Sequence, residues 1–269
     1  MRELVPADVR RQLAQPPEPA TFSEAELDGL PEAVRRHLRG AITPGTPLAT
    51  SVRLRMRGQL RLGRWLPFRA EQVLAPHRGF YWAARVAGAV GGFDRYLNGQ
   101  GELQWKLLGL LPVVQAQGPD VARSAVGRAA GEAMWIPTAL LPRFGVQWAA
   151  ADDRHVTASL GLDGVWVDLH YALEADGRIS SVVFDRWGDP DRTGSWNWHR
   201  FGGEVTGYRT FGGVTVPSGG RIGWYYGPTV GARASSSASS SPRWSWTRPH
   251  RHDPRLAWLA TVRWVGGPG

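Results

Sequence analysis

Glu132 is the residue of this chain whose surroundings are best suited to acid–base chemistry. It lies among small and apolar residues that include Ala129, Ala133 and Met134. A carboxyl group that faces an apolar cavity can serve as a general acid or base near neutral pH. The alternative is structural: Glu132 pairs with Arg128 four residues earlier, or a sheet arginine holds it. The sequence favours the structural role.

Charged residues also recur on successive predicted strands. On one face of a curved sheet they would form a polar patch able to hold the headgroup of a ligand. As cross-strand pairs on a wet face they would only stabilise the sheet, and we favour this interpretation. The residues concerned are Arg69, Glu71, Arg85, Asp94, Arg95 and Lys106.

Other catalytic or metal chemistry has little support. Ser124, His155 and Asp152 or Asp153 supply the residue types of a hydrolytic triad, but no Gly-x-Ser-x-Gly motif is present. The chain has no cysteine, and its seven histidines are scattered apart from His250-x-His252. We therefore predict neither a metal nor a cofactor.

Fourteen tryptophans are unusual for 269 residues. Eight of them are spread over most of the predicted strands. A plain aromatic core is one explanation, and an apolar hollow that admits a ligand is the other. The eight are Trp65, Trp82, Trp105, Trp135, Trp148, Trp166, Trp187 and Trp224.

One long helix is predicted over residues 119–141. Pro119 suits the first helical position, where its missing N–H is not needed. Val121, Ala125 and later alanines form an apolar stripe at three- and four-residue spacing, and Pro137 breaks the pattern. Its small side chains allow close approach to a sheet.

The segments on both sides of this helix indicate strands. Between Val52 and Leu62, apolar residues alternate with arginines and a glutamine, as in a strand with one wet face. Asn98-Gly99, Asp163-Gly164 and Asp176-Gly177 are hairpin signals. We predict a mainly β (α+β) fold: a curved antiparallel half-barrel with the helix on its concave side and short N-terminal helices.

Three regions follow from these patterns. Residues 1–49 form a helical arm, residues 50–227 the half-barrel, and residues 228–269 a Ser/Arg-rich tail predicted to be disordered. The net charge is +9, but the tail supplies +5 (six Arg minus one Asp), so we predict no nucleic-acid partner. No run of 18 apolar residues and no apolar leader is seen, and we expect a cytoplasmic protein.

Several segments together resemble a bacterial family of unknown function. They are the β-rich stretch 52–76, Trp105–Gly109, the helix segment 118–142, RWGDPD at 186–191 and the stretch 201–224. The resemblance covers residues 30–227 and implies no particular activity. The order of strands, helix and strands is also similar to the half-barrels of periplasmic lipoprotein carriers, which is a likeness of architecture alone.

The tail departs from that family after Gly227. With permitted codons, Pro228–Ser240 read one base earlier gives Asp-Arg-Trp-Arg-Glu-Gly-Glu-Phe-Phe-Arg-Phe-Glu, similar to how family members continue. We hypothesise a frameshift here, which would remove the final strand and expose a sheet edge. The alternative is a genuine serine-rich linker. Resequencing the gene and detecting tail peptides would decide between them.

The function predicted from the sequence is non-catalytic binding of an apolar or amphipathic, lipid-like small molecule inside the half-barrel. An enzyme that uses Glu132 with arginine stabilisers is one alternative. A protein-interaction module that adds a strand at an open edge is another. The predicted ligand-lining residues are Arg69, Glu71, Trp82, Trp105, Glu132, Trp135 and Arg186.

Overall fold

The computed structural model describes residues 3–14, 19–62, 64–226 and 258–264. Six antiparallel strands in chain order form the first half of the sheet. They are β1 (Val52–Leu62), β2 (Arg64–Ala75), β3 (Gly79–Val86), β4 (Val90–Leu97), β5 (Gln100–Leu107) and β6 (Leu111–Gln117).

Six further antiparallel strands form the second half. They are β7 (Gln147–Ala150), β8 (His155–Leu162), β9 (Val165–Leu173), β10 (Ile179–Gly188), β11 (Asn197–Phe211) and β12 (Val214–Trp224).

A last strand, β13 (Trp258–Trp264), joins the two halves by pairing with β1 on one side and β12 on the other. From the sequence, residues 228–269 are predicted to form a disordered tail, so β13 is a strand that was not predicted. The reason is geometric, because β1 and β12 each have backbone donors and acceptors that need a partner at this seam. Residues 228–240, on which the frameshift hypothesis depends, lie outside the described part of the chain.

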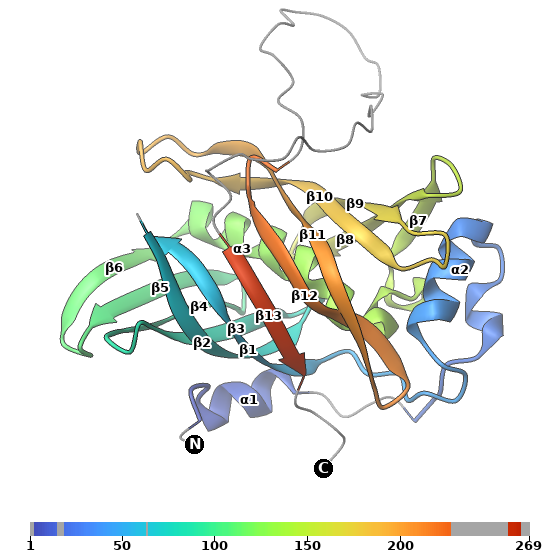
Figure 1. The fold of residues 1–269 in the computed structure, drawn as a ribbon, viewed down its shortest axis with the longest axis horizontal. Coiled ribbons are helices and arrows are strands. Elements are labelled where there is room, and N and C mark those ends of the chain that lie inside the picture. Colours follow the sequence, from blue (N-terminus) through green and yellow to red (C-terminus); the bar gives the residue numbers. More distant parts are fainter. Residues whose placement is uncertain (1–2, 15–18, 63, 227–257, 265–269) are drawn as a thin grey trace, which may run out of the picture.

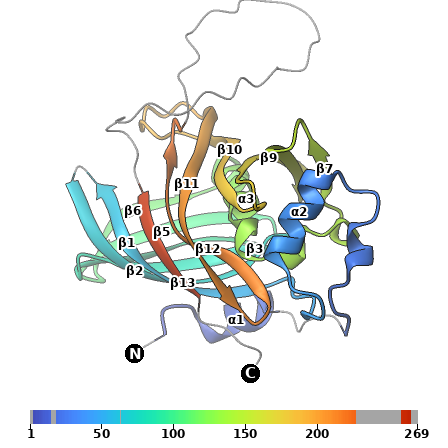
Figure 2. The same ribbon diagram turned by 45° about the vertical axis from the view of Figure 1, so that its right-hand side comes forward.

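The sheet curls around one helix, α3 (Pro119–Gly131), as Figures 1 and 2 show. β5 and β10 are far apart in the strand order, yet both contact α3. This is the predicted curved sheet with a helix on its concave side.

The helix is shorter than predicted. α3 ends at Gly131, and the chain continues in three 3-10 turns, η2 (Glu132–Trp135), η3 (Pro137–Leu140) and η4 (Pro142–Phe144). Prolines begin the second and third of these turns. They have no N–H to donate to an α-helical ladder, so the predicted end at residue 141 is wrong.

Small side chains let α3 lie close to the strands, as the stripe predicted. Val126, Ala129 and Ala130 are buried in the main core with aromatic residues such as Trp82 and Phe184. Burial of each large apolar side chain contributes roughly 1.5–3 kcal/mol to stability.

The N-terminal helices cover other surfaces. α1 (Ala7–Leu13) packs Val9 and Leu13 on the convex face of β2 and β3, against a second, smaller core. η1 (Glu24–Leu27) precedes α2 (Glu32–Ala41), which packs against β7, β8 and β12. Both faces of the sheet are therefore partly buried. None of the described helices is both long and apolar enough to cross a membrane.

Two of the three predicted hairpin turns are confirmed. Asn98-Gly99 joins β4 to β5 and Asp163-Gly164 joins β8 to β9, and both residues of each pair have positive φ. Asp176-Gly177 is instead part of a longer loop between β9 and β10. Gly177 is needed there because a Cβ would lie 2.8 Å from the carbonyl oxygen of Arg36 in α2.

Candidate functional site

Arg128 is the centre of a charged cluster between α3 and the first half of the sheet. Its Nη1 lies 2.7 Å from Asp94 Oδ2, and its Nε lies 2.8 Å from Glu132 Oε1. The side chains of all three are less than a fifth exposed. The i,i+4 pair suggested by the sequence is confirmed, with a strand carboxylate added.

The remaining oxygens of both carboxylates also have donors. Trp105 Nε1 donates to Asp94 Oδ1 at 2.9 Å, and the Gln72 amide donates to Glu132 Oε2. Each carboxylate is thus tied to the arginine and to one neutral donor. An acid–base role for Glu132 gains no support, since both its oxygens serve the cluster.

Aromatic rings enclose the guanidinium of Arg128. Its Cζ is 4.8 Å from the centroid of Phe80 and 4.7 Å from that of Trp82, and Trp82 lies 5.6 Å from Trp105. Burial disfavours the charged form, but the attraction of Glu132 and then Asp94 outweighs it. The pKa of Arg128 is therefore raised.

Arg186, on β10, lies on the other side of α3 and has a different environment. Its Nε donates to the carbonyl oxygen of Ser124 at 3.1 Å. Its Cζ stacks on Phe201 and Trp224 at 4.8 and 4.9 Å from their centroids. Across the described ranges, no carboxylate forms an ion pair with it.

The pKa of Arg186 is lowered to about 10, first by burial and then by repulsion from Arg128. The group is still a cation at neutral pH. Glu132 and Asp94 partly offset these effects without forming an ion pair with it. A largely desolvated cation that has no ion-pair partner is unfavourable, and an incoming anion would relieve this. A guanidinium in such surroundings has the hydrogen-bond donors and the charge that binding of an anionic group would need.

The structure brings together four of the seven predicted lining residues around α3: Trp82, Trp105, Glu132 and Arg186. Trp135 lies at the end of the helical segment, against the main core, and its buried Nε1 has no hydrogen-bond partner in the described chain.

The predicted position of Arg69 and Glu71 on the concave side is corrected, because both residues lie on the convex face of the sheet. Phe68 and Ala70 alternate with them and point to the core. Arg69 is exposed, whereas Glu71 is buried under the N-terminal arm, where its Oε2 accepts the Leu4 N–H at 2.7 Å. Neither lines the concave side.

Sequence reasoning missed Gln72 and Phe80 in the Arg128 cluster, and Phe201 beside Arg186. The alternation of β2 gave a signal for Gln72, since it shares the phase of Phe68 and Ala70. The proposed triad residues do not form a site: Asp152 pairs with His155 at the surface, whereas Ser124 lies on α3, where its backbone oxygen accepts a hydrogen bond from Arg186. Among the described residues, no cluster of His, Asp or Glu could hold a metal.

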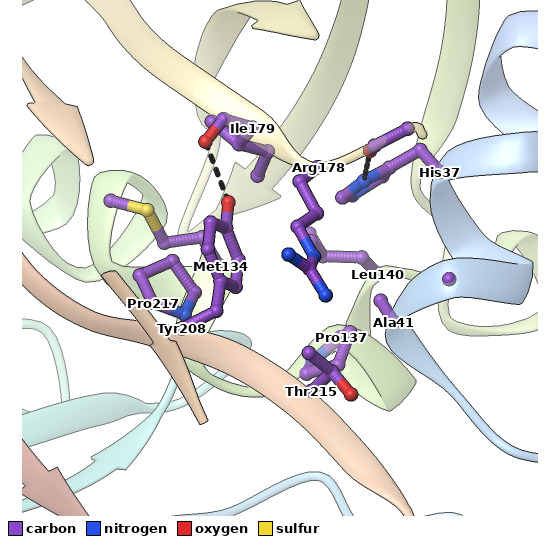
Figure 3. A pocket seen from close by; sticks show the side chains of 12 residues that line it. His37, Ala41, Met134, Pro137, Leu140, Arg178, Ile179, Tyr208, Thr215 and Pro217 are labelled. Carbon is purple, nitrogen blue, oxygen red and sulfur yellow. Dashed lines mark hydrogen bonds between the residues drawn. The ribbon is translucent and has the colours of Figure 1, made fainter. Parts of the chain in front are cut away.

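A separate small pocket lies between α2, the 3-10 turns and β12 (Figure 3). His37 is 5% exposed, and its Nδ1 lies 2.9 Å from the carbonyl oxygen of Gly177. Its Nε2 is buried with no hydrogen-bond partner in the described part. The pocket leaves about 10 Å³, which is room for about one water and not for a lipid tail.

Because burial lowers the pKa of His37, stability is expected to fall in mild acid. The unfolded chain binds the proton more readily, so this contribution is complete above about pH 6.5 and is lost as pH falls toward the folded pKa. The slope is at most about 1.4 kcal/mol per pH unit. Urea unfolding between pH 5 and 7 measures it.

His37→Asn keeps a donor for Gly177 but does not titrate, so its stability should change less with pH than the wild type. Burial also lowers the pKa of His170, which adds a dependence of the same sign. The His170→Asn variant measures that second contribution separately. An identical pH profile for His37→Asn and wild type would contradict the prediction.

The fold and the cluster define a class: a β half-barrel closed over one small-residue helix, with buried arginines in its concave side. The model of the family of unknown function DUF6544 matches residues 20–230. The chain belongs to this family. Curated proteins and solved structures give no significant match.

Proposed function

We propose that the protein binds, without catalysis, an amphipathic small molecule whose anionic head contacts Arg186 and whose apolar part follows the aromatic concave side. The observation that carries this is the guanidinium of Arg186, which stacks on Phe201 and Trp224 and forms no ion pair within the described ranges. Arg128, by contrast, forms ion pairs with two carboxylates. The difference supports Arg186 as the arginine that contacts an anionic ligand.

Curvature of the sheet supports the same proposal. Arg186 on β10 lies against α3 on the concave side and stacks on rings from β11 and β12, so a molecule bound beside it would contact both rings at once. Phe201 and Trp224 meet edge to face, with centroids 5.0 Å apart. Such a rigid aromatic wall favours an apolar chain at small loss of side-chain entropy.

Titration with dodecanoate and with dodecanol tests the proposal. The two probes share an apolar chain but differ in charge. Wild-type protein is expected to bind dodecanoate more tightly, and Arg186→Met to weaken that binding tenfold or more, since hydrogen bonds to charged groups contribute about 1.5–3 kcal/mol. Dodecanol binding should change little.

Arg178→Met is the matched control. Arg178 also stacks on an aromatic ring, with its Cζ 5.5 Å from the centroid of Tyr208, but it has Asp176 as an ion-pair partner. It should leave both affinities as in the wild type. The proposal is wrong if the wild type binds neither probe, or if Arg186→Met binds dodecanoate as tightly as wild type does.

A further inference from the structure

Three turns of the first half meet at one end of the sheet: β1–β2, β3–β4 and β5–β6. Hydrogen bonds join them side by side, from Ala87 N–H to the Pro67 oxygen at 2.8 Å and from Leu108 N–H to the Ala89 oxygen at 2.7 Å. In Figures 1 and 2 this end of β1, β2, β5 and β6 projects to the left, away from α2.

Large apolar side chains are exposed at this end. We call them the apolar tip, and their exposed fractions far exceed those of core residues. They are Trp65 at 41%, Leu108 at 71%, Leu110 at 80%, Leu111 at 63% and Val113 at 57%. Water contact of this extent is unfavourable for a cluster of such residues, so the apolar tip suits a partner that covers it.

The backbone conformation at Leu108 also favours a partner that covers the apolar tip. Leu108-Gly109 has φ angles of 51° and 75°, close to those of Asn98-Gly99 and Asp163-Gly164. Asn and Asp tolerate this left-handed conformation, whereas leucine does so poorly. A residue suited to the turn alone would therefore be polar. Leucine here is better explained by a contact that its side chain makes.

The charge around the apolar tip has one sign. Segments 57–69, 84–92 and 104–116 contain no Asp or Glu. Their cations, which we call the basic row and rim, have no ion-pair partner in the part of the chain that the structure describes. The basic row is Arg57, Arg69, Arg85 and Lys106, and the rim is Arg61 and Arg64.

The register places the basic row in line across the convex face. Arg57 is opposite Arg69, which is opposite Arg85. Gly91 separates Arg85 from Lys106 in the same line. Like charges directly opposite one another destabilise a sheet. A row of cations retained in this position therefore suits an anionic partner.

We propose that this end of the sheet docks on the surface of an anionic lipid bilayer. The apolar tip enters the boundary between headgroups and acyl chains, and the basic row and rim contact lipid phosphates. A bilayer accepts both features together, with Trp65 at the interface. A nucleic acid would match the cations alone, because its backbone offers nothing to three exposed leucines. This proposal does not depend on the ligand proposed for Arg186.

Sedimentation with phosphatidylcholine vesicles, with and without 30 mol% phosphatidylglycerol, tests the docking of the full chain. The wild type is expected to bind the anionic vesicles, and to bind them less at higher salt. Arg69→Gln/Arg85→Gln and Leu110→Ser/Leu111→Ser should each weaken binding at least tenfold. Arg154→Gln/Arg209→Gln and Trp166→Ser change exposed residues elsewhere and should bind as the wild type does.

Thermal unfolding by circular dichroism first shows that the variants are folded. If one is not, Leu108→Ser/Val113→Ser and Arg57→Gln/Arg61→Gln replace it. Absence of wild-type binding to anionic vesicles overturns the proposal, and so does wild-type-like binding by the basic-row and apolar-tip variants. Displacement of the protein from vesicles by duplex DNA or RNA at equal phosphate concentration would assign the surface to nucleic acid instead.

Discussion

The Arg128→Met variant is expected to lose about 3–5 kcal/mol of unfolding free energy, as when one partner of a buried ion pair is removed. Asp94 and Glu132 would lose their shared cation in a site where their side chains are only 19% and 13% exposed. Methionine preserves most of the volume between Phe80 and Trp82, so the loss would report charge rather than a cavity. Urea unfolding at pH 7 measures it.

Replacing the two carboxylates by neutral amides distinguishes the effect of uncompensated charge from the effect of a cavity. In Arg128→Met/Asp94→Asn/Glu132→Gln no buried charge remains, and we expect most of the lost stability to return. Arg128→Lys should be intermediate, because one ammonium cannot span two carboxylates in the way that a guanidinium does. A single variant within 1 kcal/mol of the wild type, or a triple variant no more stable than the single one, would contradict this account.

The architecture could be predicted from the sequence because the strand, helix and turn patterns all indicated the same fold. Alternation predicted β1 with its observed ends, and the proline and alanine pattern predicted α3 from its observed start. Positive-φ turns at Asn98-Gly99 and Asp163-Gly164 fixed two strand connections. Each of these signals depends on residues within about a dozen positions, which is the range where periodicity is informative.

The face on which a side chain lies was harder to predict. In β2 the alternation separates Arg69 and Glu71 from Phe68 and Ala70, but both faces of this strand bury residues, one near η2 and the other under α1. Alternation of apolar and polar residues cannot distinguish the concave face from the convex face when other elements pack on both. The alternation therefore led to the prediction that Glu71 contacts a ligand, although its carboxylate accepts a hydrogen bond from the backbone of the N-terminal arm.

The cluster itself combines distant parts of the chain. Asp94 and Arg128 were each visible as charged residues, and the Arg128–Glu132 spacing was informative. The bond from Arg128 to Asp94 joins β4 to α3, and no periodic signal connects them. β13 is a similar case, because its place between β1 and β12 is defined by strands more than thirty residues away in sequence.

Gly101→Val is expected to destabilise the protein through the backbone of α3. A Cβ at Gly101 in β5 would lie 2.5 Å from Ala122 Cα and 2.6 Å from Val121 C. These are main-chain atoms of a helix that also packs on β10, so no side chain can rotate away. Overpacking of this kind costs about 1–3 kcal/mol or more, and each kcal/mol lowers Tm by about 2–4 °C in a domain of this size.

Gly91→Ala is the matched control on the neighbouring strand, since its nearest neighbour, the Ala84 oxygen, would be 3.9 Å from the new Cβ. It should change Tm little, as measured by thermal unfolding. Gly101→Val should also weaken the Arg128–Asp94 contact, because the same displacement of α3 separates Arg128 from β4. A Gly101→Val protein as stable as Gly91→Ala would mean that α3 does not lie against β5, and the anion site proposed at Arg186, between α3 and β10, would lose its geometric basis.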